Sequence, residues 1–166
     1  MRKFALIAVV ALTATLALSA CGKQEDAQQN TQKQAQVTKP TDPNDSKAWN
    51  AYFGQIVQNN MQGMTAPNPY PYMVPAGDSA DVVSSRERQL QNVQDTVARG
   101  VLPGNMLVFA GPDSSKTADL VVTAFTDAKP GAFKDVIVLF IGDKADEPRV
   151  DTVLKPTGAK IRFVAM

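Results

Sequence analysis

The chain has 166 residues, of which 44% are hydrophobic, and its 17 basic and 16 acidic side chains give a formal charge of +1. A chain of this length predicts one domain, and its balanced charge gives no sign of the strongly basic face that nucleic-acid binding requires, so we expect no nucleic-acid partner. It contains no histidine and only one cysteine. Ser-His-acid triads, Cys-His dyads, ordinary His-ligated zinc sites and intramolecular disulfides are therefore excluded, and we expect neither a metal centre nor a cofactor.

The first 20 residues have the organisation of a secretory signal. The basic pair Arg2 and Lys3 precedes an apolar run from Phe4 to Leu18, which ends at the small residues Ser19 and Ala20. The run is too short for an ordinary membrane-spanning helix, whereas its length and its small-residue end are typical of an export signal.

The four residues Leu18-Ser19-Ala20-Cys21 resemble the lipobox of bacterial lipoproteins. The resemblance covers residues 1–22 only. It implies diacylglyceryl transfer to the sulfur of Cys21, cleavage between Ala20 and Cys21, and attachment of the mature chain to a membrane through acyl chains. The alternatives are an uncleaved signal anchor, or a soluble export signal with an incidental cysteine.

The residue that follows the lipobox cysteine influences sorting in such lipoproteins. Gly22 stands where an aspartate would resemble an inner-membrane retention signal. We therefore expect a cell-envelope location, with the protein anchored in the outer membrane and facing the periplasm.

Residues 21–45 predict a lipidated flexible tether. Apart from Cys21 and alanines, this segment contains a single apolar residue, Val37, and is otherwise dominated by glutamine, lysine, threonine and proline. Such a composition cannot bury enough surface to offset the entropy of ordering the backbone. The organisation that follows is a signal peptide over 1–20, a tether over 21–45 and one globular domain over 46–166.

Aromatic side chains open the predicted domain. Apolar residues at helical spacing predict a helix from Ser46 to about Met61, with Trp49 and Phe53 on one face. Burial in the core is one interpretation of this face. The other is a partner-binding surface that includes Trp49 and Tyr52, because aromatic anchors are enriched at interfaces.

The segment 65–78 holds four prolines and two tyrosines, Tyr70 and Tyr72. Prolines restrict themselves and their predecessors to extended or turned backbone. We expect an ordered connector that covers one edge of the core. The alternative is a preformed extended ligand or a mobile flap, in which Tyr70 and Tyr72 contact a partner.

The rest of the chain predicts an α/β fold. A second helix should run to Arg99, and after it short apolar runs alternate with helical patterns in the order strand, helix, strand, helix, strand. We therefore expect a small parallel sheet of at least three strands (βαβαβ) preceded by two helices. The predicted strands are 106–110, 136–141 and 161–164.

The two expected crossovers begin alike, since each leaves its strand through a glycine into an acidic loop. In parallel sheets, ligands tend to bind beyond the carboxyl ends of strands at a switch in strand order. Asp113, Ser114 and Asp143 are therefore the candidate ligand-binding residues, for a small anion or a hard cation. The structural interpretation is that Asp113 and Asp146 only cap helices and that Asp143 only lies in a turn.

These observations favour a binding or scaffolding role over catalysis. We expect a membrane-anchored lipoprotein that belongs to a cell-envelope complex, with an envelope protein or peptidoglycan as its partner and without enzymatic activity. One alternative is a carrier or sensor that binds a small ligand or cation at the carboxyl edge of the sheet. A less favoured alternative is a small hydrolase that uses the carboxylates of Asp113 and Asp143.

Overall fold

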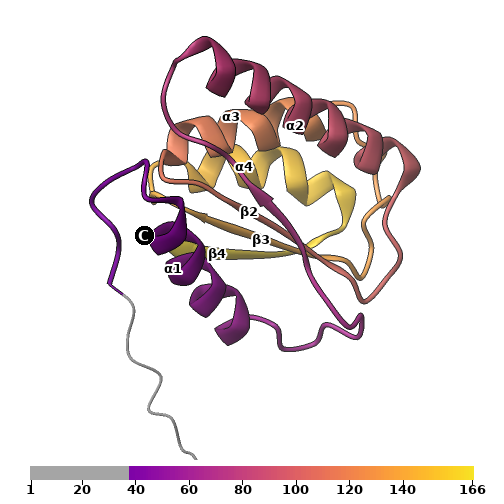
Figure 1. Cartoon of the computed structure of the whole chain (residues 1–166). Helices are drawn as coiled ribbons and strands as arrows, with labels where there is room; N and C mark the ends of the chain where they lie inside the picture. The colour runs from indigo at the N-terminus through magenta and orange to yellow at the C-terminus, as the bar shows by residue number, and fades with distance from the viewer. Residues whose placement is uncertain (1–37) are drawn as a thin grey trace, which may run out of the picture. The chain divides into compact units, whose positions relative to one another are not determined.

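The computed structural model describes residues 38–166, and the chain is a mixed α/β protein over this range (Figure 1). One helix precedes the first strand, and each later strand follows a helix. The elements are α1 (Ser46–Asn59), β1 (Tyr70–Met73), α2 (Ala80–Arg99), β2 (Met106–Ala110), α3 (Ser114–Phe125), β3 (Ile137–Gly142), α4 (Glu147–Leu154), a 3-10 helix η1 (Lys155–Thr157) and β4 (Lys160–Ala165).

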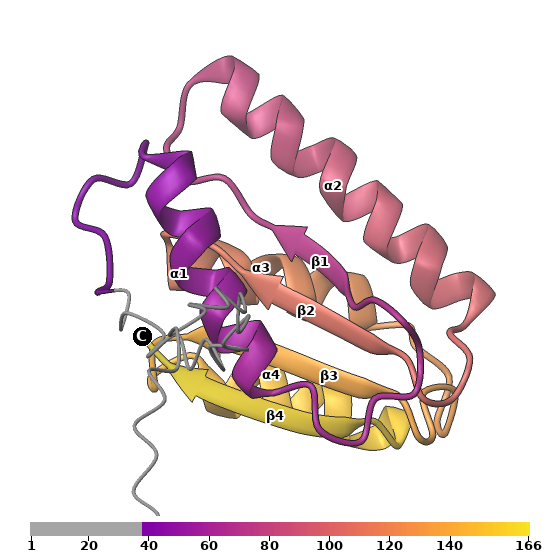
Figure 2. The ribbon, with the colours of Figure 1, turned by 60° about the horizontal axis from the view of Figure 1, so that its bottom comes forward.

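The four described strands form one parallel sheet in the order β1-β2-β3-β4. Each crossover is expected to be right-handed. Because every crossover also leads to the next strand in the same direction across the sheet, all three crossover helices lie on the same face of the sheet. Figures 1 and 2 show α2, α3 and α4 together on one face and α1 alone on the other.

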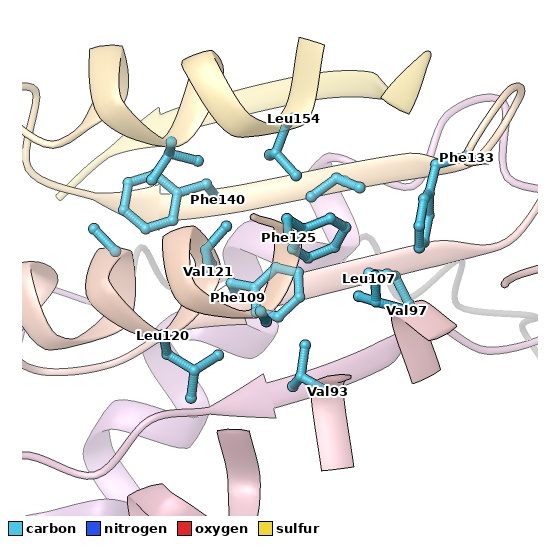
Figure 3. Packing of buried hydrophobic residues seen from close by; sticks show 14 of the residues in the cluster. Val93, Val97, Leu107, Phe109, Leu120, Val121, Phe125, Phe133, Phe140 and Leu154 are labelled. Atoms are coloured by element: carbon cyan, nitrogen blue, oxygen red, sulfur yellow. The ribbon is translucent and has the colours of Figure 1, made fainter. Parts of the chain in front are cut away.

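The larger part of the core lies between the sheet and the three helices (Figure 3). Alternate residues of the central strands point toward this side, as period-two side-chain geometry requires. Phe109 packs edge-on against Phe125, with 5.9 Å between ring centroids, and Phe125 contacts Phe133 at 5.2 Å. Both central strands are buried on both faces, which explains their uninterrupted apolar sequences.

A second apolar cluster lies between the sheet and α1. Trp49 and Phe53 are its fully buried helical members, and their rings stack with centroids 5.1 Å apart. The indole Nε1 of Trp49 donates a hydrogen bond of 2.9 Å to the carbonyl oxygen of Asp42. The end of the expected tether, 42–45, is thus ordered against the start of α1, so ordered backbone begins before Ser46.

The α/β class and the parallel sheet expected from the sequence are confirmed. The expected helix to Met61 ends two residues earlier, at Asn59, where the amide of Asn60 bonds back to Val57. The proline-tyrosine segment, which we expected to be a connector, contains the additional edge strand β1. Periodicity did not predict this strand, because it is only four residues long and contains a proline.

Ala20 and Cys21, and with them the expected signal peptide, cleavage site and lipid attachment, lie outside the described residues. None of the helices between residues 38 and 166 combines the length and the hydropathy that a membrane-spanning segment needs.

Candidate functional site

The carboxyl ends of β2 and β3 bring the candidate ligand-binding residues together. Asp113 and Ser114 follow β2, Asp143 follows β3, and the two strands are direct neighbours. The hydroxyl of Ser114 accepts a hydrogen bond of 2.7 Å from the amide of Asp143. The structure therefore places these three residues in adjoining loops at one end of the sheet.

Ser114 joins these loops through both of its hydrogen-bonding functions. Its hydroxyl also donates to the carboxylate of Asp146, at 2.5 Å. That carboxylate accepts two further bonds from the guanidinium of Arg149, at 2.8 and 2.9 Å. Asp146 occupies the N-cap position of α4 but makes no side-chain cap bond, because its carboxylate is directed to Ser114 and Arg149. Asp146 therefore stands at the cap position that the structural interpretation gave it, but its side chain bonds Ser114 and Arg149 and not the helix amides.

Arg149 extends the same network to α3. Its guanidinium donates to the carboxylate of Asp119, and to the carbonyl oxygen of Ser115 at 2.9 Å. The hydrogen bond from Arg149 to Asp119 is the main cause that raises the pKa of Arg149 above its ordinary value. The guanidinium therefore stays charged and links the amino-terminal turns of α3 and α4.

Asp113 caps α3. Its carboxylate accepts from the backbone amide of Lys116 at 3.2 Å and from the hydroxyl of Ser115 at 2.7 Å. Partial burial acts to raise the pKa of Asp113, but these hydrogen bonds and the charge of Lys116 outweigh it and hold the pKa below its usual value. The carboxylate is thus ionised at neutral pH and already engaged by its own helix.

Lys116 points away from this cap toward the segment after β1. Its ammonium bonds the carboxylate of Asp78 and the carbonyl oxygen of Gly77. Arg86 of α2 contacts the same two residues and the carbonyl oxygen of Pro75, at 3.2 Å. The hydrogen bond and charge of Lys116 hold the pKa of Asp78 below its ordinary value. Both cations therefore hold the loop between β1 and α2.

The geometry of this end of the sheet favours a structural role for the cluster. The strand order runs without reversal, so the described strands have no switch point where a ligand crevice would open. Ser114 and Asp113 make their hydrogen bonds within the protein. Within residues 38–166, no three acidic side chains gather closely enough to hold a metal ion.

The candidate partner-binding aromatics occupy different environments. Trp49 is only 4% exposed and is a core residue, so it does not form part of a free surface. Tyr52 is half-buried beside it, with 5.9 Å between the ring centroids, and burial raises the pKa of its phenol. The helical spacing that placed both on one face of α1 is thus the spacing of a core-facing stripe.

Tyr72 and Tyr70 point toward the α2 side of the sheet. Tyr72 stacks on Phe109, with centroids 5.1 Å apart and 12° between the ring planes, and its hydroxyl donates to Thr96 at 3.2 Å. Tyr70 is 51% exposed. Tyr72 therefore packs at the margin of the core, whereas Tyr70 is largely exposed to solvent.

Tyr70 forms part of a groove at the amino end of β1. The groove has a volume of about 260 Å³, and Leu102, 77% exposed, lies in its wall. Within the described part of the chain, Tyr70 and Leu102 are the large hydrophobic side chains that are mostly exposed. We call this feature the Tyr70–Leu102 groove; it is lined by Tyr70, Tyr72, Thr96, Arg99, Gly100, Val101, Leu102, Asn105 and Leu107.

A second hollow, of about 640 Å³, lies between the carboxyl-terminal ends of α2 and α3 and shares Arg99 and Gly100 with the groove. The two hollows flank the end of α2. Sequence reasoning missed Leu102, because a single leucine in a loop carries no periodic signal. Its neighbours Pro103 and Gly104 could have identified it as an apolar residue in a turn.

Comparison with known proteins gives no relative for this chain. No protein-family model, no curated protein and no solved structure matches it.

Proposed function

We propose that this chain is a lipid-anchored protein of the cell envelope whose folded domain binds a protein partner through the Tyr70–Leu102 groove. The observation that carries the proposal is that the two mostly exposed large hydrophobic side chains of residues 38–166 line one concave surface. Aromatic and aliphatic anchors in or beside a pocket, with a polar rim, are typical of protein interfaces.

The composition of the groove fits a protein surface. Arg99 and Asn105 supply polar groups around the apolar side chains of Tyr70 and Leu102. Tyrosine and arginine are the residue types that most often contribute strongly to binding energy. Tyr70 belongs to a strand and Leu102 to the loop before the neighbouring strand, so both are held by the sheet.

The location rests on the resemblance of Leu18-Ser19-Ala20-Cys21 to a lipobox and on Gly22, which favour an outer-membrane anchor facing the periplasm. Tethering restricts the domain to one membrane. It raises the effective concentration of the groove near partners in that envelope, so that modest intrinsic affinity is sufficient.

The test is site-specific photocrosslinking of the full-length protein in its own membranes. A photoreactive phenylalanine replaces Leu102, and in the matched control it replaces Ala145, which is also exposed but lies at the opposite end of the sheet. We expect one discrete adduct with another protein from position 102 and none from position 145.

A second variant examines the contribution of the tyrosine. Tyr70→Ala in the position-102 background should reduce the adduct about tenfold, the effect of losing a contact worth about 1.4 kcal/mol. Absence of a discrete adduct at position 102, or an adduct of equal yield with Tyr70→Ala, would contradict the proposed binding surface.

A further inference from the structure

The two edges of the sheet differ in the hydrogen-bonding groups that they leave free. Figure 2 shows β1 at one edge and β4 at the other. An edge strand exposes a row of unpaired amides and carbonyls, which can pair with another extended chain unless the protein blocks them.

The edge at β1 is blocked. The amide of Val74 bonds the carbonyl oxygen of Ala110 in β2, so by alternation Pro71 and Met73 point their backbone groups outward. Pro71 has no amide hydrogen to donate. The carbonyl oxygen of Met73 accepts a 2.9 Å hydrogen bond from the side-chain amide of Gln89 in α2. Another strand would therefore find few free partners here.

The edge at β4 is open. The amide of Lys160 bonds Val136 and that of Met166 bonds Gly142, so even-numbered residues of β4 direct their backbone groups toward β3. Ile161, Phe163 and Ala165 direct theirs outward, and no described residue bonds their amides or carbonyls. This edge strand is also longer than β1, at six residues.

We propose that β4 pairs antiparallel with β4 of a second copy of this chain, which joins the two sheets into one. A two-fold axis at Phe163 sets Phe163 opposite its own copy and Ile161 opposite Ala165. Of the registers that a two-fold axis allows, this one gives every outward amide and carbonyl of the three residues a partner.

The side chains suit the same register. On the helix-covered face, Phe163 meets its copy and Ile161 meets Ala165, and both Ile161 and Phe163 are half-buried apolar residues of the core margin. On the α1 face, Lys160 falls opposite Met166 and Arg162 opposite Val164. Like charges directly opposite each other would destabilise the pairing, and in this register no two cations are opposite each other.

Both cations already have partners within their own chain. Lys160 pairs with Asp135 at 2.8 Å, and Arg162 donates to the carbonyl oxygens of Asn60 and Gln62. Neither side chain is therefore an unpaired charge directed at the incoming strand. Charged side chains on an edge strand can protect it against pairing, but both cations of β4 are held by groups of their own chain.

The pairing does not depend on the proposed partner groove. The Tyr70–Leu102 groove lies beside β1, at the opposite edge of the sheet. A dimer through β4 would leave both grooves free and would present them at the two outer ends of the joined sheet.

The test is disulfide trapping with the full-length chain in isolated membranes, analysed on non-reducing gels. In the proposed register, position 163 lies about 5.5 Å from its copy between Cα atoms, within the range that a disulfide spans. We expect Phe163→Cys to form a covalent dimer on mild oxidation. The wild-type chain, whose single cysteine is Cys21, is the control for any disulfide formed through that residue.

Because Phe163→Cys removes core packing, a second set of variants tests the register independently. Positions 161 and 165 face each other across the axis, whereas each lies about 14 Å from its own copy. The double variant Ile161→Cys/Ala165→Cys should therefore crosslink at least about tenfold more efficiently than either single variant. Equal crosslinking by a single variant would overturn the register.

A proline substitution at Ala165 tests whether the outward backbone amides of β4 form the pairing. Ala165→Pro removes an outward amide that β3 does not use, whereas Ala165→Val retains it. In the Phe163→Cys background, proline should lower the dimer yield about tenfold and valine should not. Absence of a dimer from both Phe163→Cys and the double variant, or adducts with a different protein in place of the dimer, would overturn self-pairing. Failure of the photocrosslinking test at position 102 would contradict the partner groove and would leave the proposed β4 pairing unaffected.

Discussion

Ser114 was a candidate ligand-binding residue, but its hydroxyl is engaged in hydrogen bonds to other residues of the same chain. Its side chain is 3% exposed, and its hydroxyl bridges Asp146, 32 positions away, and the amide of Asp143, 29 positions away. A buried hydroxyl that both donates and accepts has little left to offer a ligand. The bridge connects the starts of α3 and α4, which explains why a serine stands at the first turn of α3.

Replacing Ser114 by alanine should lower the free energy of unfolding by about 1–3 kcal/mol, because the carboxylate of Asp146 and the amide of Asp143 each lose a partner in a partly buried site. Ser84→Ala is the matched control: this serine is exposed on α2 and its hydroxyl bonds no other described residue, so the change should stay within about 0.5 kcal/mol. Urea unfolding followed by circular dichroism measures both. Equal effects would show that the bridge contributes no stability.

At the scale of elements, the least expected feature is β1. Its sequence Tyr70-Pro71-Tyr72-Met73 contains a proline, which argues against a central strand but is compatible with an edge strand. The strand exists because β2 supplies partners and because Tyr72 stacks on Phe109 of that strand. Both contacts are tertiary, and neither leaves a periodic pattern in the segment itself. The longer helices and β2–β4, by contrast, were predicted to within two or three residues.

The turn after β2 depends on the absence of a side chain at Gly111. A Cβ atom there would collide with the carbonyl oxygen of Val74 and lie 2.6 Å from the hydroxyl of Thr117. Gly111→Ala should therefore lower the free energy of unfolding by about 1–3 kcal/mol, as overpacking does. Differential scanning calorimetry would detect the lower Tm.

Gly54 provides the opposite case. It lies within α1, and a Cβ atom there would meet nothing within 4 Å. Gly54→Ala should raise the free energy of unfolding by about 0.5–1 kcal/mol, because alanine has the higher helix propensity. A Gly111→Ala variant as stable as the wild-type protein would contradict the close approach of Gly111 to Val74, the residue after β1.

At the scale of the whole molecule, the proposed lipid anchor and the folded domain should be separable. Within the described residues, Asp42 already bonds Trp49 of the core, and Cys21 is 21 positions before Asp42 in the sequence. Chemistry at Cys21 should therefore act on location and leave the core contacts unchanged.

Cys21→Ser should release the protein from the membrane without altering its unfolding midpoint. The measurement is fractionation of cells after salt and carbonate washes, together with urea unfolding of the purified variant and of the wild-type protein. Gly22→Ala, which leaves the cysteine in place, is the control and should remain in the membrane fraction. A Cys21→Ser protein that persisted in washed membranes would contradict the lipid anchor.

The sequence by itself determined the α/β class, the helices with their apolar stripes and the buried central strands, because these depend on local periodicity and composition. It also excluded histidine- and disulfide-based chemistry. Only the tertiary structure decided that Trp49 is buried while Tyr70 and Leu102 are exposed, that Ser114 bonds two loops, and that the edge at β1 is blocked while β4 is open. Exposure and pairing depend on which distant elements pack together, and no local pattern of residues records that arrangement.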